Sequence, residues 1–537
     1  MSLQFITGNS GNGKTKYLFN RIVKEAKANP RDNYLVIVPE QFTMQTQRQL
    51  VDLSENKAIM NIDVLSFKRL AYRVFDELGI TNLTVLEETG KNLVLRKLAA
   101  QEADKLGIIG RNLNRIGYIS EVKSLLSELV QYNISPEELG RYIASGRLSD
   151  TLSDKLKDVL VLYEAFEKFM QDKYITAEEI LNVLSNVAEE SAILRNSVIA
   201  FDEFTGFTPI QNQLIKKLFV ISKKIYVTLT IDCREDIFKS RGMQELFDMP
   251  KRTVKSLTEM AAFYGIEVEE PIILDKNYRL AENEELSFME QQLFRKRRCS
   301  FKKVPKHIHI DCLRDPKQEL TKIARRINEL VRNENLRYRD IAIVTGDVNI
   351  YAGYVREIFD KYNIPYFIDA TQEILFHPFI EFIRSIPDIA AQNFSADAVF
   401  RFLRCGFSEL LDSEIDVLEN YVLACGVRGK SAWDKKWVRL PKHKAGYDLE
   451  LLNQSREYIM ELLKPVYQVF SDKKSTVKDY VLAIYKLIVL LDIPDKLAKK
   501  EQALLDAGDQ TASKEYGQIY KIVMQLFEKY VAVLGDE

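Results

Sequence analysis

Short apolar runs and helical periodicity alternate over the first 80 residues. Residues 3–7 (LQFIT) form an apolar run, which leads through a glycine-rich stretch into TKYLFNRIVKEAKA, where apolar residues recur every three or four positions. This pattern predicts a strand, a loop and a helix. The run at 34–39 (YLVIVP) predicts a buried parallel strand, because it is continuously apolar and ends in proline. Residues 62–65 (IDVL) predict a third strand, with a helix after it.

The strand pattern is interrupted between about residues 85 and 190. Leu and Ile recur there at three- and four-residue spacing, which predicts helices almost throughout. Strands are predicted again at 197–203 (SVIAFDE) and 225–232 (IYVTLTID). Long structureless loops are uncommon inside compact domains, so an inserted helical domain explains the interruption better than a loop.

A second strand–helix–strand pattern begins after residue 300. The segments 307–313 (HIHIDCL) and 340–346 (DIAIVTG) predict strands, and residues 317–334 predict the helix between them. From about 385 to 537 the pattern is helical again. Because this second pattern supplies few strands, we expect the sequence to be a segment of a longer protein.

Length and composition indicate a multidomain globular protein. The chain has 537 residues, of which 46% are apolar or aromatic, and this length suggests about three or four domains. There are 76 Lys and Arg against 77 Asp and Glu, a net charge of −1. This balance excludes a uniformly basic nucleic-acid coat protein but not a DNA channel, because charge can segregate by face.

Cysteine usage and hydropathy narrow the class further. The five cysteines form no C-x-x-C pair, so neither a zinc site nor a disulfide framework is indicated. We find no signal peptide and no apolar run of about 18 residues. The sequence therefore predicts a reduced, cytoplasmic protein with no membrane association.

The strongest chemical signal is a match to the P-loop pattern G-x-x-x-x-G-K-[ST] between the first strand and the first helix. The matching residues are Gly8, Asn9, Ser10, Gly11, Asn12, Gly13, Lys14 and Thr15. Glycines let backbone N–H groups wrap a phosphate, and the helix N-terminus adds positive potential. We expect ATP here, with Lys14 on the β- and γ-phosphates and Thr15 on Mg²⁺. The alternative is a glycine-rich turn with a solvated lysine.

Two further segments are candidate parts of the same site. The strand at 197–203 ends in Asp202 and Glu203, where Asp202 suits Mg²⁺ coordination and Glu203 could polarise an attacking water. Acidic strand ends are also common without a function. Asn277-Tyr278-Arg279 resembles the Asn-Tyr-Arg of helicases, whose arginine reaches the γ-phosphate; the alternative for Arg279 is a surface arginine.

Other features leave alternatives open. The strand at 225–232 lacks the Gly-Asp-x-x-Gln element that helicase-like ATPases usually place there. A sensor between nucleotide and DNA would then be missing, which argues against stepping along DNA. The basic run from Arg295 to Lys303 is either a solvated linker or an edge that contacts phosphates.

Together these residues resemble the B subunits of the AddAB helicase–nucleases of low-GC Gram-positive bacteria. Five more segments strengthen the resemblance, which spans essentially the whole chain: 38–43 (VPEQFT), 202–209 (DEFTGFTP), 338–342 (YRDIA), 362–369 (YNIPYFID) and 377–378 (HP). The Phe-Thr-Gly-Phe-Thr-Pro stretch is the most specific of them.

The resemblance implies a superfamily 1 helicase scaffold that is not itself the motor. In that family the partner protein AddA supplies the motor. AddB proteins bind ATP at their own P-loop and support recognition of the Chi sequence in single-stranded DNA. Their C-terminal nuclease domain, stapled by a [4Fe–4S] cluster, would lie beyond residue 537. The family often has a non-acidic residue after the strand-end Asp, so Glu203 leaves hydrolysis open.

We therefore expect an α/β fold with a RecA-like parallel sheet, helical insertions and a second, partial α/β domain. The expected division is a P-loop domain at 1–80 and 190–290, an inserted helical domain at 81–189, the start of a second helicase-like domain at 300–385, and a helical insertion domain at 386–537. The expected role is double-strand-break processing for recombination, in a heterodimer with AddA on single- and double-stranded DNA. The alternatives are an autonomous superfamily 1 DNA-dependent ATPase and a structural partner with a vestigial P-loop.

Overall fold

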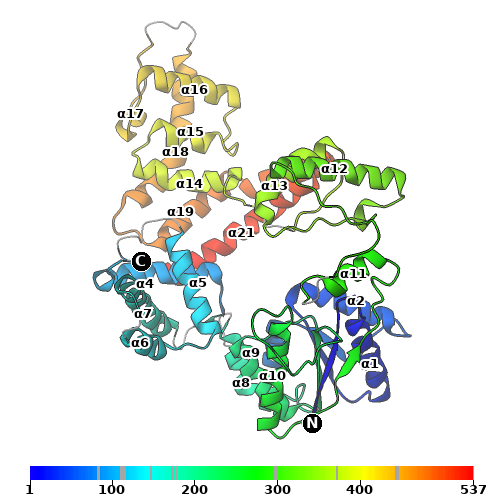
Figure 1. Cartoon of the computed structure of the whole chain (residues 1–537). Coiled ribbons are helices and arrows are strands. Elements are labelled where there is room, and N and C mark those ends of the chain that lie inside the picture. The colour runs from blue at the N-terminus through cyan, green and yellow to red at the C-terminus, as the bar shows by residue number, and fades with distance from the viewer. Residues whose placement is uncertain are drawn as a thin grey trace. The chain divides into compact units, whose positions relative to one another are not determined.

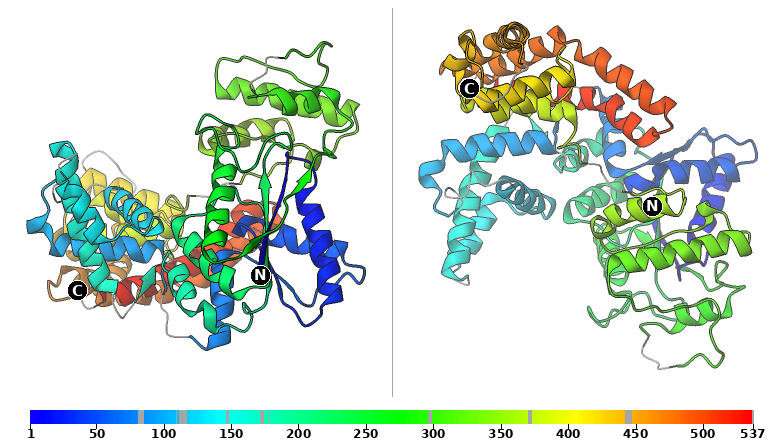
Figure 2. Two further views of the ribbon diagram at one scale, coloured as in Figure 1. Left: turned by 60° about the horizontal axis from the view of Figure 1, so that its bottom comes forward. Right: turned by 90° about the horizontal axis from the view of Figure 1, so that it is seen from above.

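The chain folds into two units, Met1–Ile308 and His309–Glu537, both drawn in Figure 1 and Figure 2. The computed structural model describes residues 1–80, 85–108, 110, 117–145, 148–170, 174–176, 178–295, 299–369, 373–441 and 447–535. Among the helices in these ranges, none has the length and apolar character needed to cross a membrane.

A seven-stranded parallel sheet forms the centre of the first unit. The strand order is β3-β2-β6-β7-β1-β8, and β9 also pairs with β1. The strands are β1 (Ser2–Gly8), β2 (Tyr34–Ile37), β3 (Ile62–Leu65), β6 (Val198–Phe201), β7 (Lys224–Thr230), β8 (Glu267–Val268) and β9 (Ile272–Leu274). Since β7 separates β1 from β6, the P-loop and the acidic end of β6 meet across the end of β7.

Helices cover both faces of this sheet, which explains why most of its strands are rich in apolar residues. On one face α1 (Lys14–Ala28) and α2 (Thr43–Leu53) bury residues such as Phe19 and Leu50 against Val36 and Ala200. The other face is covered by α3 (Phe67–Leu78), α8 (Ile180–Val187), α9 (Pro209–Ile221) and α10 (Asp248–Phe263). The helix α11 (Glu284–Gln292) follows β9 along the chain and has no buried residue.

The predicted helical stretch between β3 and β6 is confirmed, with one addition. It contains α4 (Glu88–Gln101), α5 (Tyr118–Gln131), α6 (Pro136–Ala144) and α7 (Asp150–Met170) before α8. The addition is a two-stranded parallel sheet of β4 (Val85–Leu86) and β5 (Ile175–Thr176). A strand of two residues gives too short a pattern to predict from sequence.

The described part of the second unit is helical. Its helices are α12 (Pro316–Asn333), α13 (Val348–Lys361), α14 (Pro378–Ala391), α15 (Ala396–Leu403), α16 (Asp412–Cys425), α17 (Lys430–Asp434), α18 (Leu449–Ser471), α19 (Val477–Leu490), α20 (Ile493–Asp506) and α21 (Gln510–Leu534). A small core joins α12 to α13, and a larger one runs through α14–α21.

Two predicted strands are wrong. The expected α/β class, with a RecA-like parallel sheet and helical insertions, is confirmed, and α12 confirms the predicted helix at 317–334. The segments 307–313 and 340–346, however, form no strand. Ile310 and Val344 are 95% and 93% exposed. An apolar pattern records a preference for the strand conformation, but a strand also needs a paired neighbour, and neither segment has one within the described residues.

Candidate nucleotide-binding site

The loop between β1 and α1 has the backbone geometry that a phosphate-binding loop requires. Gly11 and Gly13 adopt left-handed conformations, with φ of 89° and 79°. A Cβ on Gly11 would lie only 2.8 Å from Arg279 Cβ and from Asn277 Oδ1, so a larger residue does not fit. No side chain caps the N-terminus of α1, which begins at Lys14. The first amides of this helix are therefore available to an anion.

Lys14 folds back onto the same loop. Its Nζ donates hydrogen bonds to the carbonyl oxygens of Gly8 (3.1 Å) and Asn9 (3.0 Å). Burial lowers the pKa of Lys14, and the nearby carboxylates of Glu203 and Asp202 partly oppose this shift. An anion bound beside Lys14 would favour its charged form in the same way.

Thr15 connects the P-loop to the acidic end of β6. Its Oγ1 donates to Asp202 Oδ1 at 3.3 Å and to Glu203 Oε1 at 3.4 Å. Asp202 is 1% exposed, and burial together with the charge of Glu203 raises its pKa. Its Oδ2 is buried and has no hydrogen-bond partner among the described residues. A buried carboxylate oxygen without a partner costs free energy. A cation bound by the Thr15 hydroxyl and the Asp202 carboxylate would offset this cost, so these oxygen ligands fit a cation.

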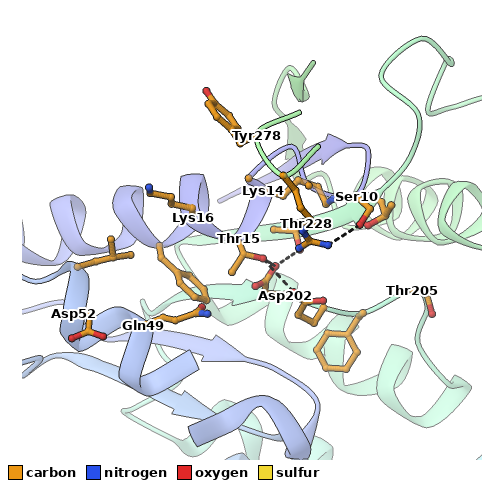
Figure 3. Close-up of a pocket in the computed structure, with 18 residues that line it drawn as sticks. Ser10, Lys14, Thr15, Lys16, Gln49, Asp52, Asp202, Thr205, Thr228 and Tyr278 are labelled. Carbon is orange, nitrogen blue, oxygen red and sulfur yellow. Dashed lines mark hydrogen bonds between the residues drawn. The ribbon is translucent and has the colours of Figure 1, made fainter. Parts of the chain in front are cut away.

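A cavity of about 690 Å³ lies over these groups (Figure 3). It is lined by the P-loop, by the strand ends of β6 and β7, by α2 and by Tyr278 and Arg279. The structure thus brings together the three segments that the sequence singled out, although they are separated by up to 271 residues along the chain (from Gly8 to Arg279). Their chemical roles stay predictions.

The Asn277-Tyr278-Arg279 segment is bonded directly to the P-loop. Asn277 Nδ2 and the Tyr278 amide donate to the carbonyl oxygens of Ser10 (2.9 Å) and Gly11 (3.0 Å). Arg279 Nη1 lies 3.4 Å from Ser10 Oγ. Arg279 also lines the cavity.

Sequence reasoning gave no role to Tyr278. This side chain is 66% exposed and lines the cavity, and its ring lies 3.5 Å from the position of a Cβ on Gly13. Its place inside the Asn-Tyr-Arg triplet was the available signal. An exposed aromatic ring at this point is suited to stack on a nucleobase.

Two asparagines of the P-loop, Asn9 and Asn12, bond it to segments that are distant in the sequence. Asn9 Nδ2 donates to Glu290 Oε1 (2.8 Å), and Asn9 Oδ1 accepts from the amide of Cys233 (2.9 Å). Asn12 Nδ2 donates to the carbonyl oxygen of Leu274 (2.5 Å). These contacts fix the loop in position before any ligand binds.

The Phe-Thr-Gly-Phe-Thr-Pro stretch anchors the chain directly after the two carboxylates. Phe204 and Phe207 pack against Phe67, with ring centroids 5.5 and 6.3 Å away. Thr208 and Gln211 then form a reciprocal capping box at the start of α9. The stretch therefore has a clear structural role, which is to fix the end of β6.

The basic run after α11 begins with an ion pair. Arg295 Nε donates to Asp232 Oδ2 at 2.9 Å, and Asp232, which is 1% exposed, also accepts from Arg234. Burial opposes ionisation of Asp232, but hydrogen bonds from Arg234 and Arg295 outweigh it and lower its pKa. Residues 296–298 lie outside the described residues, so a phosphate-contacting edge stays a prediction.

Within the described ranges, no three His, Cys, Asp or Glu side chains are grouped so that they could hold a metal ion. The five cysteines are free thiols, dispersed along the chain: Cys233, Cys299, Cys312, Cys405 and Cys425. Mg²⁺ at nucleotide sites usually takes one or two carboxylates and completes its shell with phosphates and water.

Comparison with known proteins identifies the family. A family model described as "ADDB, N-terminal" matches residues 5–290, which include the whole cavity. The chain belongs to the AddB family. The resemblance inferred from the sequence is therefore confirmed.

Relatives align with the entire chain. A protein of Lachnoclostridium phytofermentans, named as the B subunit of an ATP-dependent helicase/deoxyribonuclease, is 38% identical over 547 residues, which cover 100% of this chain and 47% of that protein. Proteins with the same name in Clostridium acetobutylicum and Clostridioides difficile are 32% and 31% identical, with the same coverage. The chain thus spans about half the length of these AddB relatives and matches their N-terminal part.

Proposed function

We propose that this chain is the helicase-like part of an AddB protein and that it binds ATP with Mg²⁺ in the cavity over the P-loop. One observation supports this most directly. Thr15 Oγ1 lies 3.3 Å from Asp202, whose other carboxylate oxygen is buried without a partner among the described residues. A hydroxyl and a carboxylate in this arrangement suit an ion that is shared with a triphosphate.

Each side chain would have a separate task. The loop amides and Lys14 bind the β- and γ-phosphates, and Thr15 and Asp202 hold Mg²⁺. When bound, the ion neutralises phosphate charge. Arg279 approaches the γ-phosphate, and Tyr278 offers a stacking surface to the base. Glu203 is the candidate base for activating water if hydrolysis occurs.

The role of the nucleotide in this proposal is conformational. The strand β7 leads into Asp232, which accepts hydrogen bonds from Arg234 and Arg295. Helicase-like ATPases usually have their Gln-bearing segment at this point. Without that segment, nucleotide binding is hard to convert into stepping, so ATP would mainly stabilise one conformation of the chain. AddA would then supply the motor.

The wider function rests on the names of the relatives. They are B subunits of ATP-dependent helicase/deoxyribonucleases. We propose that the chain acts with AddA as a heterodimer in the cytoplasm, contacts single- and double-stranded DNA, and supports Chi recognition during double-strand-break repair. The nuclease domain and its [4Fe–4S] cluster would belong to the part of the AddB relatives that this chain does not span. The four-part domain division set out from the sequence is part of the same proposal.

Substitution of Lys14 tests ATP binding. We expect Lys14→Ala to abolish binding of labelled ATP while the fold stays intact, because the loop loses its only side-chain cation. The free energy of unfolding of the wild-type protein should rise by about 2.7 kcal/mol at a hundredfold excess of ATP over Kd. The measurement is thermal unfolding with and without MgATP. If Lys14→Ala shows the same shift as wild type, Lys14 has been assigned wrongly.

A second candidate is an autonomous superfamily 1 motor. It is favoured by Glu203, which lies 3.4 Å from Thr15, and by Arg279 in the cavity wall. DNA-stimulated ATP hydrolysis by the purified chain, lost in Glu203→Gln, would support it over the conformational role. A vestigial P-loop would instead show no ATP binding at millimolar concentration.

A further inference from the structure

Thr228 lies in β7, beside the acidic end of β6. The pairing of Phe201 with Val227 places Asp202 and Thr228 next to each other on neighbouring strands. Thr228 is 3% exposed, and its Oγ1 donates a short hydrogen bond to Asp202 Oδ1. No P-loop or strand-end motif includes this threonine.

The two oxygens of Asp202 have different surroundings. Oδ1 accepts from Thr228 on one side and from Thr15 on the other. Oδ2 is buried and has no partner among the described residues. Two hydroxyls from two different elements therefore fix the rotation of the carboxylate and leave Oδ2 as the oxygen without a hydrogen bond among the described residues.

We infer that Thr228 is the positioning residue for the Mg²⁺ of the proposed nucleotide site. This inference rests on the proposed function, since the ion arrives with the nucleotide. Thr228 does not touch the ion or the phosphates in this scheme. It acts through Asp202, as the partners of metal ligands commonly do, and loss of such a partner typically weakens metal affinity by about 10- to 100-fold.

Thr7 provides a matched control in the same sheet. It lies in β1, pairs in register with Leu229 and is 1% exposed. Its Oγ1 has no hydrogen-bond partner among the described residues. The substitution Thr7→Val therefore removes a buried hydroxyl of the same kind without removing a hydrogen bond.

The experiment measures the Mg²⁺ dependence of nucleotide binding in the full 537-residue chain. A fluorescent ATP analogue is titrated in EDTA and at a series of Mg²⁺ concentrations, with wild type, Thr228→Val, Thr228→Ser and Thr7→Val. We expect the Mg²⁺ concentration that gives half of the Mg²⁺-dependent increase in analogue affinity to be about 10- to 100-fold higher in Thr228→Val. Thr228→Ser and Thr7→Val should behave as wild type, and affinity in EDTA should be equal in all four proteins.

Several results would overturn the inference. One is a wild-type Mg²⁺ dependence in Thr228→Val; another is an equal loss in Thr7→Val, which would mean a general effect of altering the sheet. Melting temperatures in EDTA report whether each variant folds. If Thr228→Val does not fold, Thr228→Ala is used in its place. Absence of nucleotide binding by wild type would instead refute the proposed function itself, which separates the two failures.

Discussion

At the scale of single residues, Glu203 combines a candidate chemical role with backbone strain. It adopts a left-handed conformation with φ of 63°, which costs a non-glycine residue about 1–2 kcal/mol. Its neighbours enforce this conformation, because Asp202 is buried on one side and Phe204 is packed among aromatic rings on the other. Strain that persists in this way is typical of functional sites.

The strain can be measured with two variants that both lack the carboxylate. We expect Glu203→Gly to be more stable than Glu203→Ala by about 1 kcal/mol, because glycine adopts positive φ without a Cβ penalty. Both variants lose the contact with Thr15, so the difference reports the backbone alone. The measurement is denaturant unfolding. Equal stability of the two variants would show that the position is not strained.

The residues that could be singled out from the sequence belong to local patterns, whereas those that could not are defined by bonds to residues far away in the sequence. The loop at 8–15 could be singled out because its pattern lies within one contiguous segment, and the structure places it at the cavity. Asp202 could be singled out because it ends an apolar strand, and it also lies in the cavity lining. Thr228 and Glu290 could not, because Thr228 bonds a residue 26 positions away and Glu290 bonds one 281 positions away. Only the pairing of strands and the placement of α11 bring those partners together.

At the scale of elements, prediction succeeded where a local apolar run was enough to indicate a strand. The strands β1, β2, β3, β6 and β7 were all predicted, because strands that are covered by helices on both faces are rich in apolar residues and stand out in the sequence. The strands β8 and β9 have two and three residues, too few to show a pattern. The segments 307–313 and 340–346 were predicted wrongly, since pairing depends on partners that a local pattern does not reveal.

The helix α14 has an unusual N-terminus, at which the cap residue is a buried histidine. His377 Nδ1 accepts from the amide of Phe379 at 3.1 Å, and its ring lies 4.5 Å from that of Tyr516 in α21. The side chain is 8% exposed, and its Nε2 has no partner among the described residues. Burial lowers the pKa of His377 below its usual value.

This cap should make stability depend on pH. Because the pKa of His377 is lower in the folded chain, the unfolded chain binds a proton first as pH falls below about 6.5. Stability should then fall by up to about 1.4 kcal/mol per pH unit. Asparagine also caps helices but does not titrate, so His377→Asn should lose stability less steeply between about pH 7 and 5. Denaturant unfolding across this range is the measurement, and identical slopes would contradict the assignment.

At the scale of the whole molecule, the two units have separate cores. Those of the first unit lie on the two faces of the parallel sheet, and those of the second join α12 to α13 and bind α14–α21 together. All the residues that line the candidate nucleotide cavity belong to the first unit, between Ser10 and Arg279. The direct contacts of a bound nucleotide would therefore stabilise the first unit.

Amide hydrogen exchange of the full chain with and without MgATP tests this expectation. Protection should rise in the P-loop, at the end of β6 and in 274–290. Hydrogen bonds of Asn9, Asn12 and Asn277 join the loop to 274–290, and those of Thr15 join it to the end of β6. The rise at saturating ATP is bounded by the binding free energy, about 2.7 kcal/mol at a hundredfold excess over Kd. Helices α14–α21 should change little, and Lys14→Ala should show no change anywhere. Equal protection of both units in wild type would mean that the nucleotide acts on the whole chain, and the same protection in Lys14→Ala would mean that it binds elsewhere.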